Sequence, residues 1–391
     1  MNPASLLAFA LAAAPAWAVT ENLQAVQKGT EIVITGREDA PPSEAEQEEL
    51  DLSSKSVADL ATLYFSAGDA DSKLRVLHRL SLTEPRTGED MRRLLDLHAR
   101  DAAARSAADA CLERLSPAAQ GFGPYFAALL DDEDPLLRIF GLAGLRRLRY
   151  APALPAVRKL AEGRFPQRRP SMLMDPAQNA EWRTRFEALG ALAVWERKDA
   201  LPLLLKKTAE APAVASIVAA LFWEEAFDRI VAWSKSKKAE DQEAAQAAWG
   251  ADVAPEQLRP TWPKLLALAL DKRADPQTRH RAAVKLGLAA GEAEAKTLLE
   301  KREAALKDKD ERTRLLLESA LFASGSPLAI PLLEEHARSN PAPEGRAGAR
   351  LQLKGMLPRG RYLELLREAA EKDPDGENRA AARRELDAEG K

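Results

Sequence analysis

Apolar residues recur at helical spacing along most of this chain. The first clear set is Val57, Leu60, Ala61, Tyr64 and Phe65, which occupies one face of a helix with i, i+3, i+4, i+7 periodicity. Runs of Val and Ile that would form strands are nearly absent. The pattern therefore predicts an all-α protein, with helices beginning near Ser56.

A second pattern is Asp followed four positions later by Arg, which returns at intervals near roughly 33 residues or multiples of that length. An Asp at the start of a helix accepts hydrogen bonds from free N–H groups of the first turn, and it can pair with the Arg one turn later. A period of this length predicts an α-solenoid, a superhelix of stacked helix pairs. The predicted structural caps are Asp71, Asp101, Asp134, Asp275, Asp310 and Asp375.

A third pattern is an apolar residue followed by Pro, which suits the first turn of a helix because the missing N–H has no partner there. It occurs at Leu154-Pro155, Leu201-Pro202, Trp262-Pro263 and Ile330-Pro331. Two of these prolines follow an Asp of the second pattern by the same distance. We therefore expect each Asp to open the first helix of a pair and each apolar-Pro to open the second.

Together these patterns resemble HEAT-like repeats, in the short variety found in phycobilin lyases and many bacterial proteins. The resemblance covers roughly residues 69–388 and implies a solenoid that binds other molecules, without implying an activity. A tetratricopeptide array has a similar period, but its Trp…Leu-Gly…Tyr motif is not found. The solenoid is expected to span residues 56–391, with a terminal capping helix from Gly376 whose outer face is polar.

The N-terminus has the features of a secretory signal peptide over residues 1–18, with cleavage after Ala18. No Lys or Arg precedes its apolar stretch, and the alternative is an N-terminal membrane anchor. Residues 19–55 read as an extended or flexible segment with one short strand at 31–35 and an acidic run from Glu44 to Asp51. We expect an exported bacterial protein of the periplasm or cell envelope that is not an integral membrane protein.

The charge and the reactive residues exclude several functions. The formal net charge of −3 and the pI of about 6.0 argue against nucleic acid as a partner. Cys111 is the single cysteine, so no intrachain disulfide can form, and its apolar setting predicts a buried, inert thiol. The four histidines are scattered, and no Gly-x-Ser-x-Gly or phosphate-binding Gly loop occurs. No catalytic residue, metal site or cofactor is therefore predicted, and the protein is not expected to be an enzyme.

Two regions depart from the repeat pattern and supply the candidate binding residues. One is a Pro-rich, basic insertion near 162–176, and the other is a concentration of tryptophan, with six of the seven Trp residues between 182 and 262. Arg and Trp are favoured at binding hot spots, so an acidic partner or a peptide groove is one interpretation. A solvated loop and aromatic core filling are the alternatives. The predicted contact residues are Arg168, Arg169, Trp182, Arg183, Arg185 and Trp223.

The sequence therefore favours an exported scaffold or adaptor that binds a protein or peptide along the solenoid. One alternative is an enzyme of the bilin-lyase type, which only the repeat resemblance suggests. Another is a structural component of the envelope, in which the strand at 32–35 adds to the sheet edge of a partner. The identity of the partner, the binding face and the oligomeric state stay open.

Overall fold

The computed structural model describes residues 51–168 and 176–389, and these residues are helical with no strand. They divide at Val253 into an N-terminal unit and a C-terminal unit, and each is a stack of paired helices. The predicted all-α solenoid is therefore confirmed. The signal peptide, the strand at 31–35, most of the acidic run and Arg169 lie outside the described residues.

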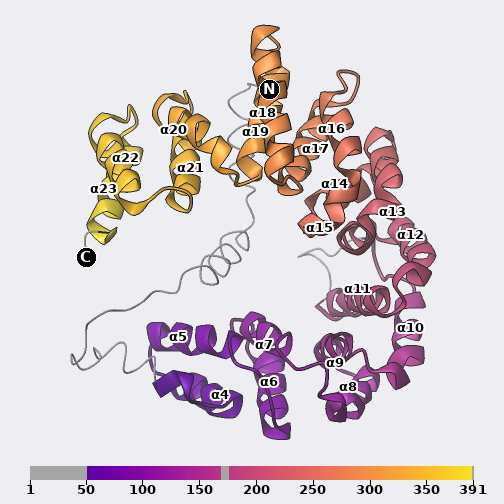
Figure 1. Ribbon diagram of the computed structural model, residues 1–391. Helices are drawn as coiled ribbons and strands as arrows, with labels where there is room; N and C mark the ends of the chain where they lie inside the picture. The colour runs from indigo at the N-terminus through magenta and orange to yellow at the C-terminus, as the bar shows by residue number, and fades with distance from the viewer. Residues whose placement is uncertain (1–50, 169–175, 390–391) are drawn as a thin grey trace. The chain divides into compact units, whose positions relative to one another are not determined.

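Helices of about two to six turns build the N-terminal unit (Figure 1). Short 3-10 turns lead into several of them. In chain order they are α4 (Val57–Ser66), α5 (Ala70–Ser81), α6 (Gly88–Arg100), α7 (Arg105–Leu112), α8 (Gly123–Ala128), α9 (Pro135–Leu148), α10 (Leu154–Glu162), α11 (Pro176–Glu196), α12 (Leu201–Glu210), α13 (Ala215–Lys235) and α14 (Ala239–Gly250).

The C-terminal unit continues the same architecture from Ala254 onward. Its helices are α15 (Pro255–Leu258), α16 (Trp262–Leu270), α17 (Pro276–Leu288), α18 (Glu292–Lys307), α19 (Glu311–Ala323), α20 (Ile330–Ser339), α21 (Pro343–Lys354), α22 (Arg359–Lys372) and α23 (Gly376–Glu389).

The helices pair differently from the prediction, with each pair shifted by one helix along the chain. The helix opened by apolar-Pro packs most extensively against the helix that follows it, as α10 does with α11, α16 with α17 and α20 with α21. Helices of successive pairs then stack side by side, as in α9 with α11 and α17 with α19. The expectation that each Asp opens the first helix of a pair is therefore wrong. The turn that carries the Asp lies inside the pair.

Several of the predicted Asp caps begin helices as their chemistry requires. Asp134, Asp275 and Asp310 are the N-caps of α9, α17 and α19, and each accepts a hydrogen bond from a main-chain N–H of the first turn. Asp375 precedes α23 and accepts from the N–H of Asn378 at 2.8 Å. These carboxylates set where each helix begins.

Two of the predicted caps act elsewhere. The N-cap of α5 is Asp69, whereas Asp71 lies exposed in the first turn. The side chain of Asp101 accepts from the N–H of Ala104 at 3.1 Å, but α7 begins after Ala104 rather than after the Asp. Asp101 also accepts a hydrogen bond from the hydroxyl of Tyr64 at 2.9 Å, which ties the turn to α4.

Arginines one turn into a helix can stabilise the turn that precedes it. Arg138 and Arg379, which follow Asp134 and Asp375, do so, and so does Arg346, where Ala342 stands in place of the Asp. In each case Nη1 donates to the main-chain carbonyls six and five residues earlier. The distances are 2.8 and 3.4 Å for Arg138, 2.7 and 3.4 Å for Arg346, and 2.6 and 3.1 Å for Arg379. A hydrogen bond from a charged donor contributes about 1.5–3 kcal/mol, more than the exposed ion pair expected from the sequence. We call this arrangement the arginine clamp.

The core of the N-terminal unit is rich in rings. Phe126 and Phe140 are fully buried, with ring centroids 5.8 Å apart. His98 packs against Phe140 and is also fully buried, with its Nδ1 2.8 Å from a carboxylate oxygen of Asp109. The His98 ring is thus part of the core between α6 and α9.

Candidate functional site: a basic face on α10 and α12

The two predicted tryptophans belong to the core. Trp182 is 5% exposed, and its ring lies 5.3 Å from Phe165 and 5.2 Å from Phe186. Trp223 is 1% exposed and packs edge-on against Trp249. A partner cannot touch either ring without unpacking the helices around it. The interpretation of these residues as a peptide groove is therefore wrong, and aromatic core filling is the one that the structure supports.

The predicted arginines have different surroundings. Arg168 pairs with Glu240 and Glu243 at 3.0 and 3.4 Å. Arg185 pairs with Glu181 one helical turn away. The charges of Arg168 and Arg185 are thus already compensated. Arg183 is half-buried in α11.

A different set of cations is uncompensated within the described part of the N-terminal unit. No described carboxylate lies within ion-pair distance of these side chains, and all are exposed. We call them the basic face, and they are Arg149, Lys159, Arg164, Arg197 and Lys206.

The carboxylates of the same stretch are almost all engaged in ion pairs. Five carboxylates of α10 to α12 pair with Arg or Lys side chains of the same or neighbouring helices. These carboxylates are Glu162, Glu181, Glu187, Glu196 and Glu210. Asp199, exposed in the turn before α12, is the carboxylate in the described part of this stretch that forms no ion pair. The positive charge of the basic face is therefore not neutralised by its surroundings.

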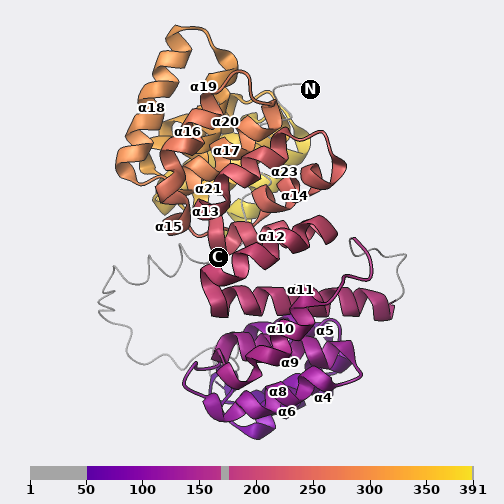
Figure 2. The same cartoon turned by 90° about the vertical axis from the view of Figure 1, so that its right-hand side faces the viewer.

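Two residues of the basic face occupy matching turns. Arg149 ends α9 with φ of 51°, and Arg197 follows α11 with φ of 53°. The helices α9 and α11 pack side by side, with α9 below α11 in Figure 2, and each of the two residues lies at the C-terminal end of its helix. A left-handed residue other than Gly costs about 1–2 kcal/mol, which a cation near a helix C-terminus partly offsets.

Two more residues occupy matching positions on the helices that follow those turns. Lys159 lies four residues after Pro155 in α10, and Lys206 lies four residues after Pro202 in α12. The two helices are joined where Lys207 Nζ donates to the Gly163 carbonyl at 2.9 Å. Arg164 is adjacent to that carbonyl, so the basic face runs the length of α10.

Sequence reasoning missed this set for a physical reason. The net charge of the whole chain is −3, which hides the excess of Lys and Arg between α9 and α12. A charge count over a window of one or two repeats would have found the excess. It would not have found which cations are free, because their neutralising partners come from other repeats, as Glu196 does for Arg158.

The groups that could support chemistry are held in other roles. Burial raises the pKa of the Cys111 thiol to about 12, and the thiol donates to the Thr83 carbonyl at 3.1 Å. No group of three or more His, Cys, Asp or Glu suited to a metal occurs among the residues that the structure describes. None of the described helices is long and apolar enough to cross a membrane.

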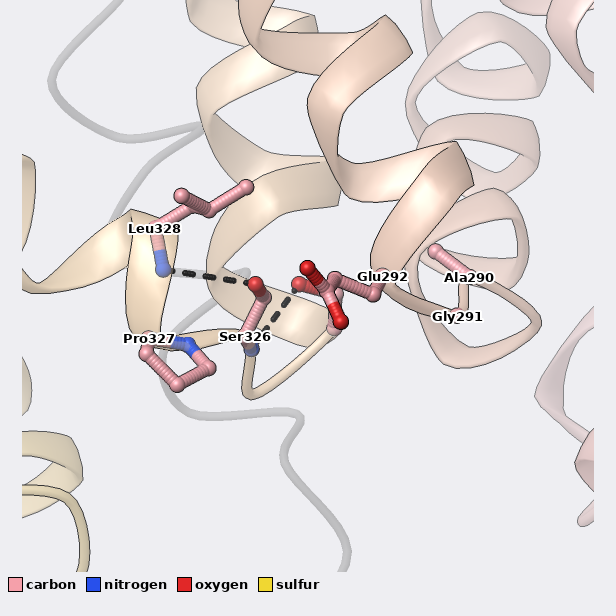
Figure 3. A pocket seen from close by; sticks show the side chains of 7 residues that line it. Ala290, Gly291, Glu292, Ser326, Pro327 and Leu328 are labelled. Carbon is pink, nitrogen blue, oxygen red and sulfur yellow. Dashed lines mark hydrogen bonds between the residues drawn. The ribbon is translucent and has the colours of Figure 1, made fainter.

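A hollow of about 470 Å³ lies in the C-terminal unit, between the turn before α18 and the turn after α19 (Figure 3). Its polar atoms are used by the turn itself: Ser326 Oγ accepts from the Leu328 N–H at 3.3 Å, and the Ser326 N–H donates to Ser324 Oγ at 3.1 Å. Glu292 is the titratable residue that lines it. The hollow therefore holds no paired nucleophile and base.

Comparison with known proteins adds little. No family model and no curated protein sequence matches the chain. Among solved structures, the chain is similar to yeast importin-beta (Kap95p), with a TM-score of 0.34 and 11% sequence identity over 85% of this chain and 52% of that chain. The chain thus spans about half the length of the importin-beta chain.

Proposed function

We propose that this protein is an exported scaffold that binds a partner protein or peptide through an acidic segment of that partner. Residues 1–18 support export, because they have the composition and the small-x-small site of a signal peptide. The observation that carries the binding proposal is the basic face. Five exposed cations without a described counter-ion lie on two successive repeats, among carboxylates that are otherwise engaged. The kinship with the phycobilin-lyase type of repeat stays a prediction from the sequence.

The spacing of the basic face favours a linear acidic segment. Adjacent packed helices lie about 8–10 Å apart, so matching residues such as Arg149 and Arg197 are separated by a similar distance. Carboxylates seven residues apart on a helix lie on one face and are about 10 Å apart, whereas residues on one side of an extended chain are about 7 Å apart. A helical acidic segment therefore presents acids at the interval of the repeats.

Charge also favours a protein partner over nucleic acid. The chain as a whole carries a net charge of −3, so the residues outside this basic stretch are strongly acidic in sum. A phosphate backbone extending beyond the basic face would meet that acidic surface and be repelled. A short acidic peptide fits within the positive region.

The binding test uses a fluorescent oligo-glutamate peptide titrated into the full chain. The double variant Arg149→Gly/Arg197→Gly removes two charges at positions where Gly is the preferred residue, so the fold is expected to keep or gain stability. We expect the affinity to fall by about tenfold or more and to weaken with added salt in the unmodified chain.

Lys309→Gly is the matched control. Lys309 has a φ of 57°, lies in the C-terminal unit and is not part of the basic face. This substitution makes the same change of residue type and backbone preference, and we expect it to leave the peptide affinity unchanged. Equal affinities for the double variant and the unmodified chain would refute the proposal.

Export is tested separately by fusing residues 1–18 to a phosphatase that is active only outside the cytoplasm of a bacterial host. Activity is expected for the fusion, and its loss is expected when a Lys replaces Leu7 in the apolar stretch. An inactive fusion would remove the export part of the proposal and leave the binding part standing.

A further inference from the structure

The chain carries an acidic segment of its own directly before α4. Residues 38–54 contain no Lys, Arg or His, and their acids include Glu44, Glu46, Glu48, Glu49 and Asp51. Asp51 pairs with Lys55 at 3.2 Å. The four glutamates precede the described part of the chain and have the charge that complements the basic face.

The length of chain decides whether these glutamates can reach the basic face of their own molecule. Glu44 lies seven residues before Asp51, which is at most about 25 Å of extended chain, and Glu49 is within about 7 Å. From α5 the stack passes through α7 and α9 to α11, which is three steps of about 8–10 Å. Glu46, Glu48 and Glu49 therefore fall short of α10 and α12, and Glu44 barely approaches them.

A second copy of the chain meets no such constraint. We infer that the acidic segment of one molecule, residues 44–49, binds the basic face on α10 and α12 of another molecule, in a head-to-tail contact. The inference rests on the proposed function because it uses the same basic face. The contact joins two different surfaces, so it propagates into a ring or an open chain. An external acidic partner competes with it, which makes self-association a regulator of binding.

The charge of the segment fits this occupant. Four glutamates lie within six residues, from Glu44 to Glu49, with no Lys, Arg or His among them. The basic face has five exposed cations without a described counter-ion, so the two surfaces are opposite in sign and similar in number of charges.

The test follows the molar mass of the full chain by sedimentation across a dilution series. The first variant is Glu44→Gln/Glu46→Gln/Glu48→Gln/Glu49→Gln, which keeps the basic face, and the second is Arg149→Gly/Arg197→Gly, which keeps the acidic segment. We expect the unmodified chain to associate with rising concentration at low salt and each variant alone to be monomeric. Added salt is expected to dissociate the unmodified chain, because the contact is exposed to solvent.

Mixing the two variants gives the decisive result. Each supplies the half that the other lacks, so we expect a one-to-one dimer that cannot extend further. The Lys309→Gly variant is expected to associate like the unmodified chain. Failure of the mixed variants to form a complex would overturn the inference, and so would association of both variants on their own.

Failure of this inference is distinguishable from failure of the proposed function. If the unmodified chain stays monomeric but binds oligo-glutamate through Arg149 and Arg197, the self-association is refuted and the proposed function stands. If the quadruple Gln variant binds oligo-glutamate more tightly by a factor that does not change with protein concentration, the segment occupies its own molecule and the second-copy contact is refuted.

Discussion

The two units of this protein share one helical architecture but fill their cores with different chemistry. In the N-terminal unit, rings such as Phe126, Phe140 and Trp223 occupy the interior between helices. In the C-terminal unit, leucine and alanine occupy most of the interior, and buried charged side chains lie among them: Glu318 is 0% exposed and the side chain of Asp373 is 1% exposed. The repeat pattern of helices therefore does not dictate how the space between them is filled.

The charged core is a chain of hydrogen bonds that joins α18 to α23. Arg302 and Arg314 donate to the same oxygen of Glu318 at 2.9 and 2.7 Å, and His336 lies 3.4 Å from the other oxygen. His336 also contacts the amide of Asn340 at 3.1 Å.

Beyond Asn340, the chain of contacts ends on Asp373. Arg346 donates to the Asn340 carbonyl at 2.7 Å and to Asp373 at 2.7 Å, and Arg350 donates to Asp373 at 2.8 Å. Removing any one member of such a network is strongly destabilising, because the charge of its partner is left buried without a counter-ion. An aromatic core has no equivalent sensitivity to a single charge.

Removing Asp373 is expected to produce the largest effect. Asp373→Ala leaves the guanidinium groups of Arg346 and Arg350 buried without a counter-ion, and we expect the C-terminal unit to lose about 3–5 kcal/mol. Hydrogen exchange read by mass spectrometry checks this helix by helix, with faster exchange expected in α20 to α23. Replacing the three charges together, as Arg346→Met/Arg350→Leu/Asp373→Leu, should recover most of the loss. A triple variant as unstable as the single one would show that packing, not charge, dominates there.

A smaller loss of stability is expected when an aromatic ring is removed from the N-terminal core. Trp223→Leu removes part of a fully buried ring between Phe227 and Trp249, and we expect a cost of about 2–3 kcal/mol in the N-terminal unit. Urea unfolding followed by exchange in α13 and α14 measures it. Trp195→Leu is the control, because Trp195 is only half-buried and should cost less. Equal costs at the two positions would contradict the picture of a ring-filled core.

Low pH is expected to destabilise the C-terminal unit, by less than either of these substitutions. Burial by itself raises the pKa of Asp373, but hydrogen bonds from Arg346, the Asp375 amide and Arg350 outweigh it and hold that pKa well below its usual range. A carboxyl whose pKa is lower in the folded state stabilises the fold above its unfolded value of about 3.9, and this stability is lost as the pH falls through the folded pKa. The C-terminal unit should therefore weaken below about pH 4.

The same reasoning applies to Glu318, where hydrogen bonds and charges from His336, Arg314 and Arg302 outweigh burial and lower the pKa. The check is to measure the free energy of unfolding against pH for Asp373→Asn. Its slope in acid should be shallower than that of the unmodified chain, by the contribution of one carboxyl. An unchanged slope would mean that Asp373 does not titrate with unfolding.

The smallest expected effect distinguishes two neighbouring carboxylates of α5. Asp69 is the N-cap, so Asp69→Ala should cost about 1 kcal/mol. Asp71 is exposed in the first turn and contributes through the helix dipole, so Asp71→Ala should cost about 0.3–0.5 kcal/mol. Thermal unfolding of both variants measures the difference. A larger cost at Asp71 would support Asp71 as the cap, as the Asp-Arg pattern of the sequence predicted.

The sequence was sufficient for the helices and for four of the six helix starts that the Asp pattern marked, because capping and periodicity are local. Asp134 lies beside the amides it accepts from, and Pro135 beside the turn it opens. The partners of the arginines were not predictable in the same way. Arg138 and Arg149 are eleven positions apart and alike in type, yet the first is held by main-chain carbonyls and Glu181 and the second is exposed. Glu181 belongs to the next repeat, so only the packed structure distinguishes them.

The arginine clamp has a consequence for how the chain tolerates changes in length. Because Arg138, Arg346 and Arg379 each grip carbonyls at a fixed interval, one added residue in those turns would carry the acceptors out of register. The turns that follow α9 and α11, where Arg149 and Arg197 lie, hold no arginine clamp among the residues that the structure describes. Insertions, tags and grafted peptides should therefore be accepted in those turns, beside the basic face, and rejected in the clamped turns.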